Sequence, residues 1–188
     1  MPGTSRLHEV RTALSVVSHR TERLVRSLAE ADVPIEGSAW TVRDAAIHVA
    51  MVGFRYAGMI RGESNQYPSL DPETCARLND QLNADIPESD PGRLAALVHE
   101  ATACLLAAAA SFIDTHEVLF HGETLITAPD LLGSALAEHL VHGHDMALAV
   151  GRPWPLDVHH AALALLGSGP GYGFGCPSAS QSRERNMT

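Results

Sequence analysis

The chain of 188 residues is long enough for one domain of ordinary size with a hydrophobic core of its own. Apolar residues make up 45% of the chain and charged residues 19%, the balance of a globular protein rather than a disordered one. The formal net charge of -9, with no basic stripe to neutralise phosphates, argues against a nucleic-acid partner.

The cysteines and the N-terminus indicate a reducing cytoplasm. Cys75, Cys104 and Cys176 are odd in number and widely spaced, which is typical of neither a disulfide framework nor a zinc finger. The first residues lack the basic-then-apolar organisation of a signal peptide. The most apolar stretch, LAALVHEATACLLAAAASFI, contains His99 and Glu100 and predicts a buried helix, not a membrane span. We therefore expect a cytoplasmic protein with no membrane partner.

Apolar residues at helical spacing predict the first two helices. The first runs from Arg6 to Ala31, with charged residues between the apolar ones, and DVPIEGSAW then breaks it. The second opens at TVRD, where Thr41 can cap the free amides and Asp44 can complete a capping box. It is expected to end at Gly62.

The middle of the chain predicts two more helices and a short extended pair. After the loop ESNQYPSLDPE, a helix is expected from about Glu73 to Ala84. IPESDPG interrupts the chain, and an alanine-rich helix follows from about Gly92 to Phe112. The stretch HEVLFHGETLIT suggests two short strands around Gly122.

The last strong helix begins near TAPD, with Thr127 as cap and Asp130 closing a second capping box. It is expected to reach Val150 and to stop at Gly151. LDVHHAALALLG can add a short helix. We predict an all-α, up-and-down four-helix bundle with short extra helices over residues 1–166. Residues 167–188, rich in Gly, Ser and Pro, are expected to form a flexible tail.

Ionisable residues crowd into the last helix, in the segment AEHLVHGHDMA. Glu138 and His142 are four residues apart and so lie on one face, one turn from each other, and Asp145 falls on nearly the same line. His139 and His144 point elsewhere and are interpreted as ordinary polar residues, partly exposed or facing the bundle. A buried carboxylate beside a histidine is costly unless a cation lies between them, and a divalent metal meets that need.

A third metal ligand would have to come from another helix, and His48 is the candidate. It stands in the middle of the second predicted helix among Ile47, Val49 and Ala50, a stretch too apolar for a surface histidine. A lone histidine on an apolar face is more often a hydrogen-bonded core residue. Glu-x-x-x-His likewise occurs on many solvated helix faces, so spacing alone leaves both readings open.

The remaining histidines and cysteines carry weaker signals. His116 and His121 stand beside the predicted strand pair, where they could flank a cleft. His159 and His160 carry no readable signal. The free cysteines of the helical region, Cys75 and Cys104, are interpreted as small buried residues rather than nucleophiles.

Two motifs carry a resemblance to a known family. AWTVRDAAIHVA and FHGETLITAPDLLGSALAEHLVHGHDMALAVGRPWPL, with RLNDQL between them, resemble the mycothiol-dependent maleylpyruvate isomerase family. The resemblance covers about Leu7 to Leu166 and is to the family's N-terminal metal-binding domain, part of the DinB-like superfamily of four-helix metalloproteins. It implies a metal held by His48, Glu138 and His142. Characterised isomerases of the family carry a further C-terminal domain that this sequence does not continue into, so the resemblance does not name the substrate.

The resemblance implies an enzyme that uses a low-molecular-weight thiol, mycothiol. Three protein ligands with an open position describe a catalytic metal site, and zinc is favoured, although nickel, iron or manganese would suit the same atoms. A metal-activated thiolate would attack a small electrophilic substrate, giving thiol transfer or, after bond rotation and thiol release, isomerisation. Asp145 would not bind the metal itself but would orient a metal ligand or a neighbouring polar group.

Two other readings remain open from the sequence. The chain can be a non-catalytic metal- or ligand-binding helical bundle with the same three ligands, or a purely structural helical domain. Its partners are expected to be the small thiol and the electrophile, and its assembly a monomer or homodimer.

Overall fold

The structure is a computed structural model that describes residues 5–63, 67, 71–121 and 124–167. Within these ranges the chain forms helices joined by loops and one short hairpin. In chain order the elements are α1 (Arg6–Arg26), α2 (Val42–Ile60), α3 (Pro72–Asp85), α4 (Pro91–Ala108), β1 (Glu117–Leu119), β2 (Leu125–Thr127), α5 (Ala128–Ala149) and α6 (Val158–Gly167).

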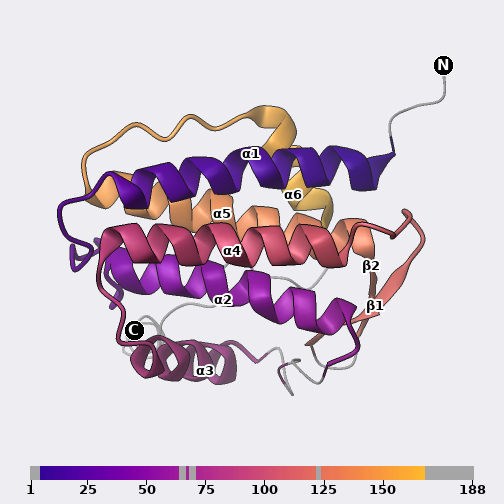
Figure 1. The fold of residues 1–188 in the computed structure, drawn as a ribbon, viewed down its shortest axis with the longest axis horizontal. Coiled ribbons are helices and arrows are strands. Elements are labelled where there is room, and N and C mark those ends of the chain that lie inside the picture. Colours follow the sequence, from indigo (N-terminus) through magenta and orange to yellow (C-terminus); the bar gives the residue numbers. More distant parts are fainter. Residues whose placement is uncertain (1–4, 64–66, 68–70, 122–123, 168–188) are drawn as a thin grey trace, which may run out of the picture.

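Four long helices form the bundle, which confirms the predicted all-α fold (Figure 1). Going round the ring, α1 packs on α4, α4 on α2, α2 on α5, and α5 again on α1. The helices α1 and α5 run in one direction and α2 and α4 in the other. Two successive helices therefore run parallel, because the chain returns through α3 to the end of the bundle where α2 began.

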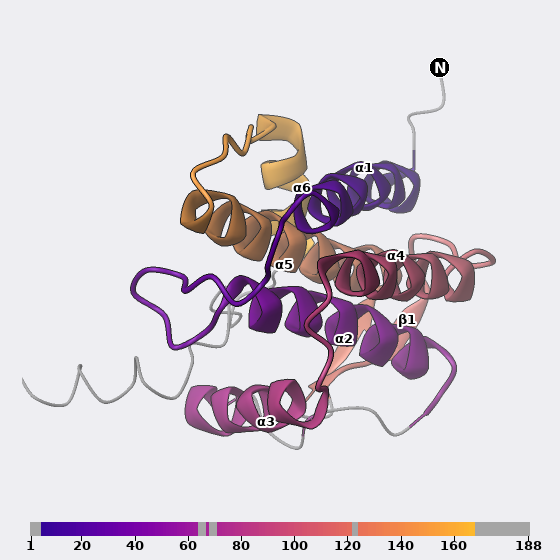
Figure 2. The same cartoon turned by 60° about the vertical axis from the view of Figure 1, so that its left-hand side comes forward.

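The two shorter helices lie outside the ring of four, on opposite sides (Figure 2). The helix α3 packs on α2, and α6 packs on α5 beside α1. Within the described residues, no helix is long and apolar enough to cross a lipid bilayer. The predicted tail, apart from Gly167, lies outside the described residues.

Local capping explains where the bundle helices begin. Both predicted capping boxes are present, with Thr41 and Asp44 opening α2 and Thr127 and Asp130 opening α5. The helices α3 and α4 begin instead with an aspartate cap followed by proline, which has no amide hydrogen to leave unpaired. The first helix ends earlier than predicted, at Arg26, where the amide of Ser27 bonds back to the last turn.

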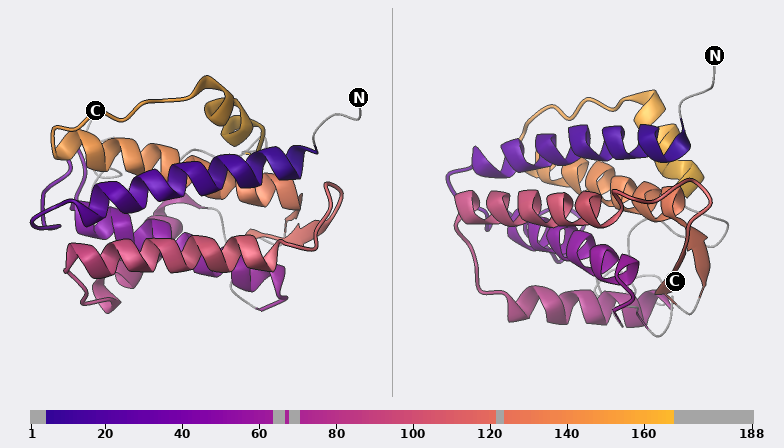
Figure 3. Two further views of the ribbon diagram at one scale, coloured as in Figure 1. Left: turned by 45° about the horizontal axis from the view of Figure 1, so that its top comes forward. Right: turned by 45° about the vertical axis from the view of Figure 1, so that its right-hand side comes forward.

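The predicted extended pair is also present, as a hairpin at the end of the bundle where α4 finishes and α5 starts (Figure 3). The strands β1 and β2 are antiparallel, with Val118 opposite Ile126. The residue on which the prediction was centred, Gly122, is outside the described residues. The hairpin matters for the site because β1 leads directly into Phe120 and His121, both buried.

Buried apolar side chains form two clusters, one toward each end of the bundle. The cluster near the starts of α2 and α4 includes Trp40, Ile47, Leu94 and Met146. Alanine and glycine let the helices approach closely: a Cβ added at Gly53 would lie 3.0 Å from that of Ala101 on α4. The candidate site described next lies beside this cluster, where α2 faces α5.

Candidate metal centre

Two antiparallel helices bring the predicted ligands together. His48 lies in the first half of α2, and Glu138 and His142 lie one turn apart, in the middle of α5 and in its second half. Because α2 starts at the end of the bundle where α5 finishes, these parts of the two helices face each other. The three residues that spacing and resemblance selected are therefore neighbours, although 90 residues separate His48 from Glu138.

Both histidines of the triad lie close to the same carboxylate oxygen of Glu138. Glu138 Oε2 lies 3.2 Å from His48 Nε2 and 3.1 Å from His142 Nε2. The two imidazole rings are nearly perpendicular, at 76°, with centroids 4.9 Å apart. Each residue offers one possible ligand atom, a ring nitrogen or a carboxylate oxygen. These three atoms all lie within 4.8 Å of one another, a spacing that could hold a metal ion.

Burial leaves these polar atoms without enough partners. His48 is 4% exposed and His142 is 7% exposed. Within the described residues, His48 Nδ1 and His142 Nε2 have no hydrogen-bond partner. His142 Nε2 is close to Glu138 Oε2, but the two are not aligned for a hydrogen bond. The donor atoms thus lie side by side around a common point, and a bound cation fits them better than their mutual contacts do.

The electrostatics favour the protonation states that bind metals. Burial by itself raises the pKa of Glu138, but the His142 and His48 imidazoles outweigh burial and bring that pKa well below its usual range. Burial lowers the pKa of His48, against the opposing pull of Glu138. The site therefore holds a carboxylate and, at His48, a neutral imidazole, and these are the forms that coordinate a divalent ion.

Trp40 packs against one side of the site, a contact that the sequence did not reveal. Its ring centroid lies 5.0 Å from that of His48 and 5.6 Å from that of His142. The indole Nε1 donates a hydrogen bond of 2.8 Å to Asp80 Oδ1 on α3. Trp40 therefore packs against both histidines of the triad and ties this wall to α3.

A second group of polar residues lies further along α2. Arg55 is seven residues after His48 and so lies on the same helix face, two turns away. Its guanidinium stands 4.0 Å from the ring centroid of Tyr67. The Tyr67 amide donates a 2.7 Å hydrogen bond to His121 Nδ1, and the two rings stack with centroids 4.8 Å apart.

His121 is electrostatically coupled to both the triad and this second group. Burial, and next the positive charge of Arg55, lower its pKa to about 4, while the negative charge of Glu138 acts in the opposite direction. From its place beside the predicted strand pair, His121 was expected to be able to flank a cleft. The structure buries it after β1, close enough to Arg55 and Glu138 to feel both charges. A neutral imidazole and a guanidinium thus stand beside the candidate metal centre.

Asp145 differs from its predicted surroundings. Its Oδ1 lies 3.4 Å from Nδ1 of the adjacent His144, and its side chain is 40% exposed. Within the described residues it makes no hydrogen bond to His48, Glu138 or His142. Helical spacing placed it on the line of Glu138, but the side chain is paired with His144 near the surface. Its predicted role in orienting a ligand therefore has no contact to support it.

The other histidines are placed as ordinary polar residues. His139 is buried and faces the bundle, with Nδ1 3.2 Å from Thr21 Oγ1 and Nε2 3.4 Å from Thr102 Oγ1. His144 is on the surface, and His116 stacks on Phe112.

The two cysteines in the described residues lie on helices other than the two that carry the triad. Cys75 is buried in α3, as predicted. Cys104 is half-buried on α4, and its sulfur accepts a 2.9 Å hydrogen bond from Arg61.

Comparison with known families agrees with this geometry. The family model of the mycothiol maleylpyruvate isomerase N-terminal domain matches residues 14–147. The chain belongs to this family. The matched range contains all three residues of the candidate metal centre and most of the bundle, and it ends before the segment that joins α5 to α6. No curated protein and no solved structure matches the chain.

Proposed function

We propose that this member of the mycothiol maleylpyruvate isomerase N-terminal domain family is a metal-dependent enzyme. It would hold zinc or a similar divalent ion through His48, Glu138 and His142. It would use a small thiol, mycothiol, to modify or isomerise a small electrophile. The observation that carries the proposal is the convergence of three buried donor atoms from α2 and α5, with His142 Nε2 left without a hydrogen bond.

A divalent ion bound there would lower the pKa of a coordinated thiol, making it a thiolate nucleophile near neutral pH. The chain's own residues supply the other requirements. Glu138 contributes the negative charge that offsets part of the ion's charge, and Trp40 covers the histidines on one side. Three protein ligands leave a position of a tetrahedral site free for the thiol.

The residues beside the triad have roles in binding the electrophile. The positive charge of Arg55 can orient an electron-rich group of the substrate, and neutral His121 can donate a hydrogen bond from Nε2, because its Nδ1 already accepts the Tyr67 amide. Thiolate addition that leaves the new C–S bond in place is thiol transfer, and it is completed either by protonation of the adjacent carbon or by loss of a leaving group such as the chloride of chlorodinitrobenzene. Addition, rotation about the former double bond and expulsion of the thiolate is isomerisation.

The first test is metal content. Purified wild-type protein is expected to carry about one divalent ion per chain, measured by elemental analysis after dialysis. His142→Gln should lose it, because two remaining ligands hold a divalent ion poorly against water. His144→Gln is the matched control, since His144 is two residues away but exposed, and this variant should keep the metal. Equal metal content in the two variants would contradict the proposed ligand set.

The second test separates an enzyme from a metal-binding bundle without turnover. Metal-loaded protein is incubated with mycothiol and either maleylpyruvate, to follow isomerisation, or chlorodinitrobenzene, to follow thiol transfer. Cys75→Ser and Cys104→Ser should remain active, because the nucleophile belongs to the added thiol. A metal-loaded chain inactive on a wide panel of electrophiles would support the non-catalytic bundle. Loss of turnover in a folded, metal-loaded cysteine variant would place the nucleophile on the protein.

A further inference from the structure

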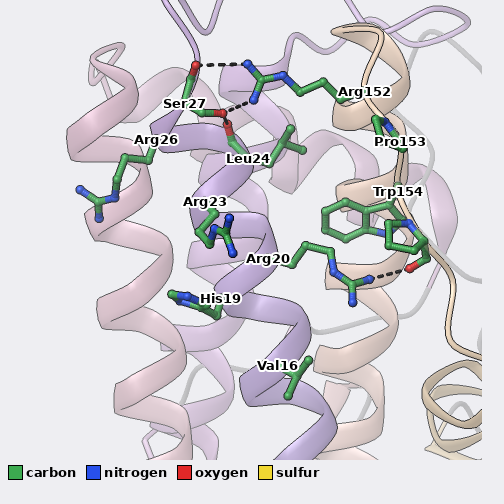
Figure 4. Close-up of a pocket in the computed structure, with 11 residues that line it drawn as sticks. Val16, His19, Arg20, Arg23, Leu24, Arg26, Ser27, Arg152, Pro153 and Trp154 are labelled. Atoms are coloured by element: carbon green, nitrogen blue, oxygen red, sulfur yellow. Dashed lines mark hydrogen bonds between the residues drawn. The ribbon is translucent and has the colours of Figure 1, made fainter.

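A groove on the outer side of α1 is separate from the metal centre (Figure 4). One wall is the second half of α1, and the other is the segment Arg152–Pro155, which follows α5. The groove has a volume of about 760 Å³, in the range of roughly 300–1,000 Å³ typical of small-molecule sites. The triad lies between α2 and α5, whereas this groove lies between α1 and the segment that follows α5.

Arginine side chains gather around this groove in an otherwise acidic chain. Four of the 13 Lys and Arg side chains line it, although the net charge of the whole chain is -9. The arginines are Arg20, Arg23, Arg26 and Arg152. Arg26 is neutralised by Glu22, at 2.9 Å. Within the described residues, the other three form no ion pair with an acidic side chain.

Two of these arginines cross from one wall of the groove to the other. Arg20 of α1 donates a 2.5 Å hydrogen bond to the Pro155 carbonyl. Arg152 reaches back to α1, where it bonds the hydroxyl and the carbonyl of Ser27. Trp154 and Leu24 lie between these two crossings (Figure 4). The two arginine crossings thus close the groove at both ends of the space over Trp154. A closed space of this kind suits a small molecule better than a continuous peptide.

Trp154 supplies an apolar surface fixed in position. A Cβ added at Gly143 would lie 2.2 Å from Trp154 Cζ2, so only glycine lets the indole lie this close to α5. The Arg20 guanidinium stands 5.4 Å from the ring centroid. The indole Nε1 is buried and, within the described residues, has no hydrogen-bond partner.

The end of α1 does not by itself account for this positive charge. Arginines in a last helical turn offset the negative end of the helix dipole, and this explains Arg23 and Arg26. Arg20 stands a turn earlier, and Arg152 comes from a different segment. Both use neutral oxygen atoms as acceptors, so their charges remain available to an anion.

We propose that this groove binds a small organic anion with a flat apolar body. Its carboxylate, sulfonate or phosphate group would be held by Arg23, with Arg20 and Arg152 adding positive charge at the two ends of the groove. Arginine suits such groups because its planar fork pairs two of their oxygens at once. The apolar body would rest against Trp154 and Leu24.

Calorimetric titration with anilinonaphthalene sulfonate tests the proposal. We expect saturable binding to wild-type protein that weakens as salt is added, and weaker binding of uncharged naphthol. Arg23→Gln should reduce the affinity for the sulfonate about tenfold or more, the loss expected for one charge-assisted hydrogen bond. Arg23 makes no ion pair within the described residues, so this substitution should leave the fold intact.

Arg77→Gln is the matched control, because it removes the same charge from an exposed position on α3. It should leave the affinity unchanged. A Trp40→Phe background provides a second measurement, since Trp154 is then the one tryptophan of the chain and its fluorescence should change on binding. Absence of saturable binding, equal losses in Arg23→Gln and Arg77→Gln, or no loss in Arg23→Gln would overturn the proposal.

Discussion

At the scale of single residues, His121 shows how the fold controls a charge. Its Nδ1 accepts the hydrogen bond from the Tyr67 amide and must be unprotonated to do so. Burial and the nearby Arg55 also oppose a positive charge there, and the pKa falls to about 4 from an ordinary 6.5. The folded protein thus keeps His121 neutral through a pH range in which an unfolded chain would protonate it.

This difference predicts a pH-dependent stability. Above pH 6.5 the imidazole is neutral in both states and contributes nothing. As the pH falls from 6.5 to about 4, the unfolded chain binds a proton that the folded chain does not, so the free energy of unfolding falls. The loss should be on the order of 2–3 kcal/mol. It is measured by urea unfolding at several pH values.

His121→Gln should reduce this dependence without abolishing it, because glutamine does not titrate, whereas buried His139, whose pKa burial lowers to about 3, still contributes over the same pH range. Exposed His8 provides the control, and His8→Gln should keep the wild-type slope. If His121→Gln retained the full slope between pH 6.5 and 4, the loss of stability would belong to another group.

At the scale of elements, the crossing of α5 and α6 depends on two glycines. A Cβ added at Gly133 would lie 2.8 Å from the Cα of Gly167 and 3.2 Å from the carbonyl oxygen of Leu163. These are backbone atoms, which cannot move aside as the end of a flexible side chain can. The close contact therefore requires glycine for steric reasons, although glycine is a poor helix former.

We predict that Gly133→Ala lowers the free energy of unfolding by about 1–3 kcal/mol, the usual cost of overpacking. Alanine's better helix propensity would act in the opposite direction by up to about 1 kcal/mol. Thermal and urea unfolding measure the balance. Leu166→Ala, at an exposed position of α6, should change stability by only a few tenths of a kcal/mol. A Gly133→Ala variant more stable than the wild type would show that α6 does not need this close approach.

At the scale of the whole molecule, the candidate metal centre connects two helices that are far apart in the chain, α2 and α5. An ion held by His48, Glu138 and His142 would join α2 to α5 across one side of the ring. Because the unfolded chain does not bring these residues together, the ion would bind the folded state preferentially. Metal binding and global stability should therefore be linked.

Free zinc at a hundred times its Kd is expected to raise the free energy of unfolding of metal-free protein by about 2.7 kcal/mol. Chelation should reverse the gain. Glu138→Gln should abolish most of it by removing the charged ligand, while Cys75→Ser should keep it. An equal gain in Glu138→Gln and wild-type protein would mean that zinc stabilises the chain from another site.

The sequence by itself determined the features that depend on neighbours a few residues away. The capping boxes at Thr41 and Thr127 and the hairpin follow from local spacing and turn residues, and all are present. The triad was identifiable because Glu138 and His142 share a helix face and because His48 stands in an apolar stretch of helix, and the family resemblance points to the same three residues. The family itself was also recognisable from these motifs.

Only the tertiary structure decided what lies around those residues, because these contacts join segments far apart in the chain. Trp40 reaches α3 through Asp80, 40 residues away, and Arg152 bonds Ser27 across 125 residues. Helical spacing aligned Asp145 with Glu138, but in the structure its carboxylate lies 3.4 Å from His144 Nδ1 at a partly exposed position. The total charge of the chain gave no sign of the arginine groove, since its cations come from two separate segments. Periodicity specifies which face of a helix is buried, whereas packing of whole helices decides which faces meet.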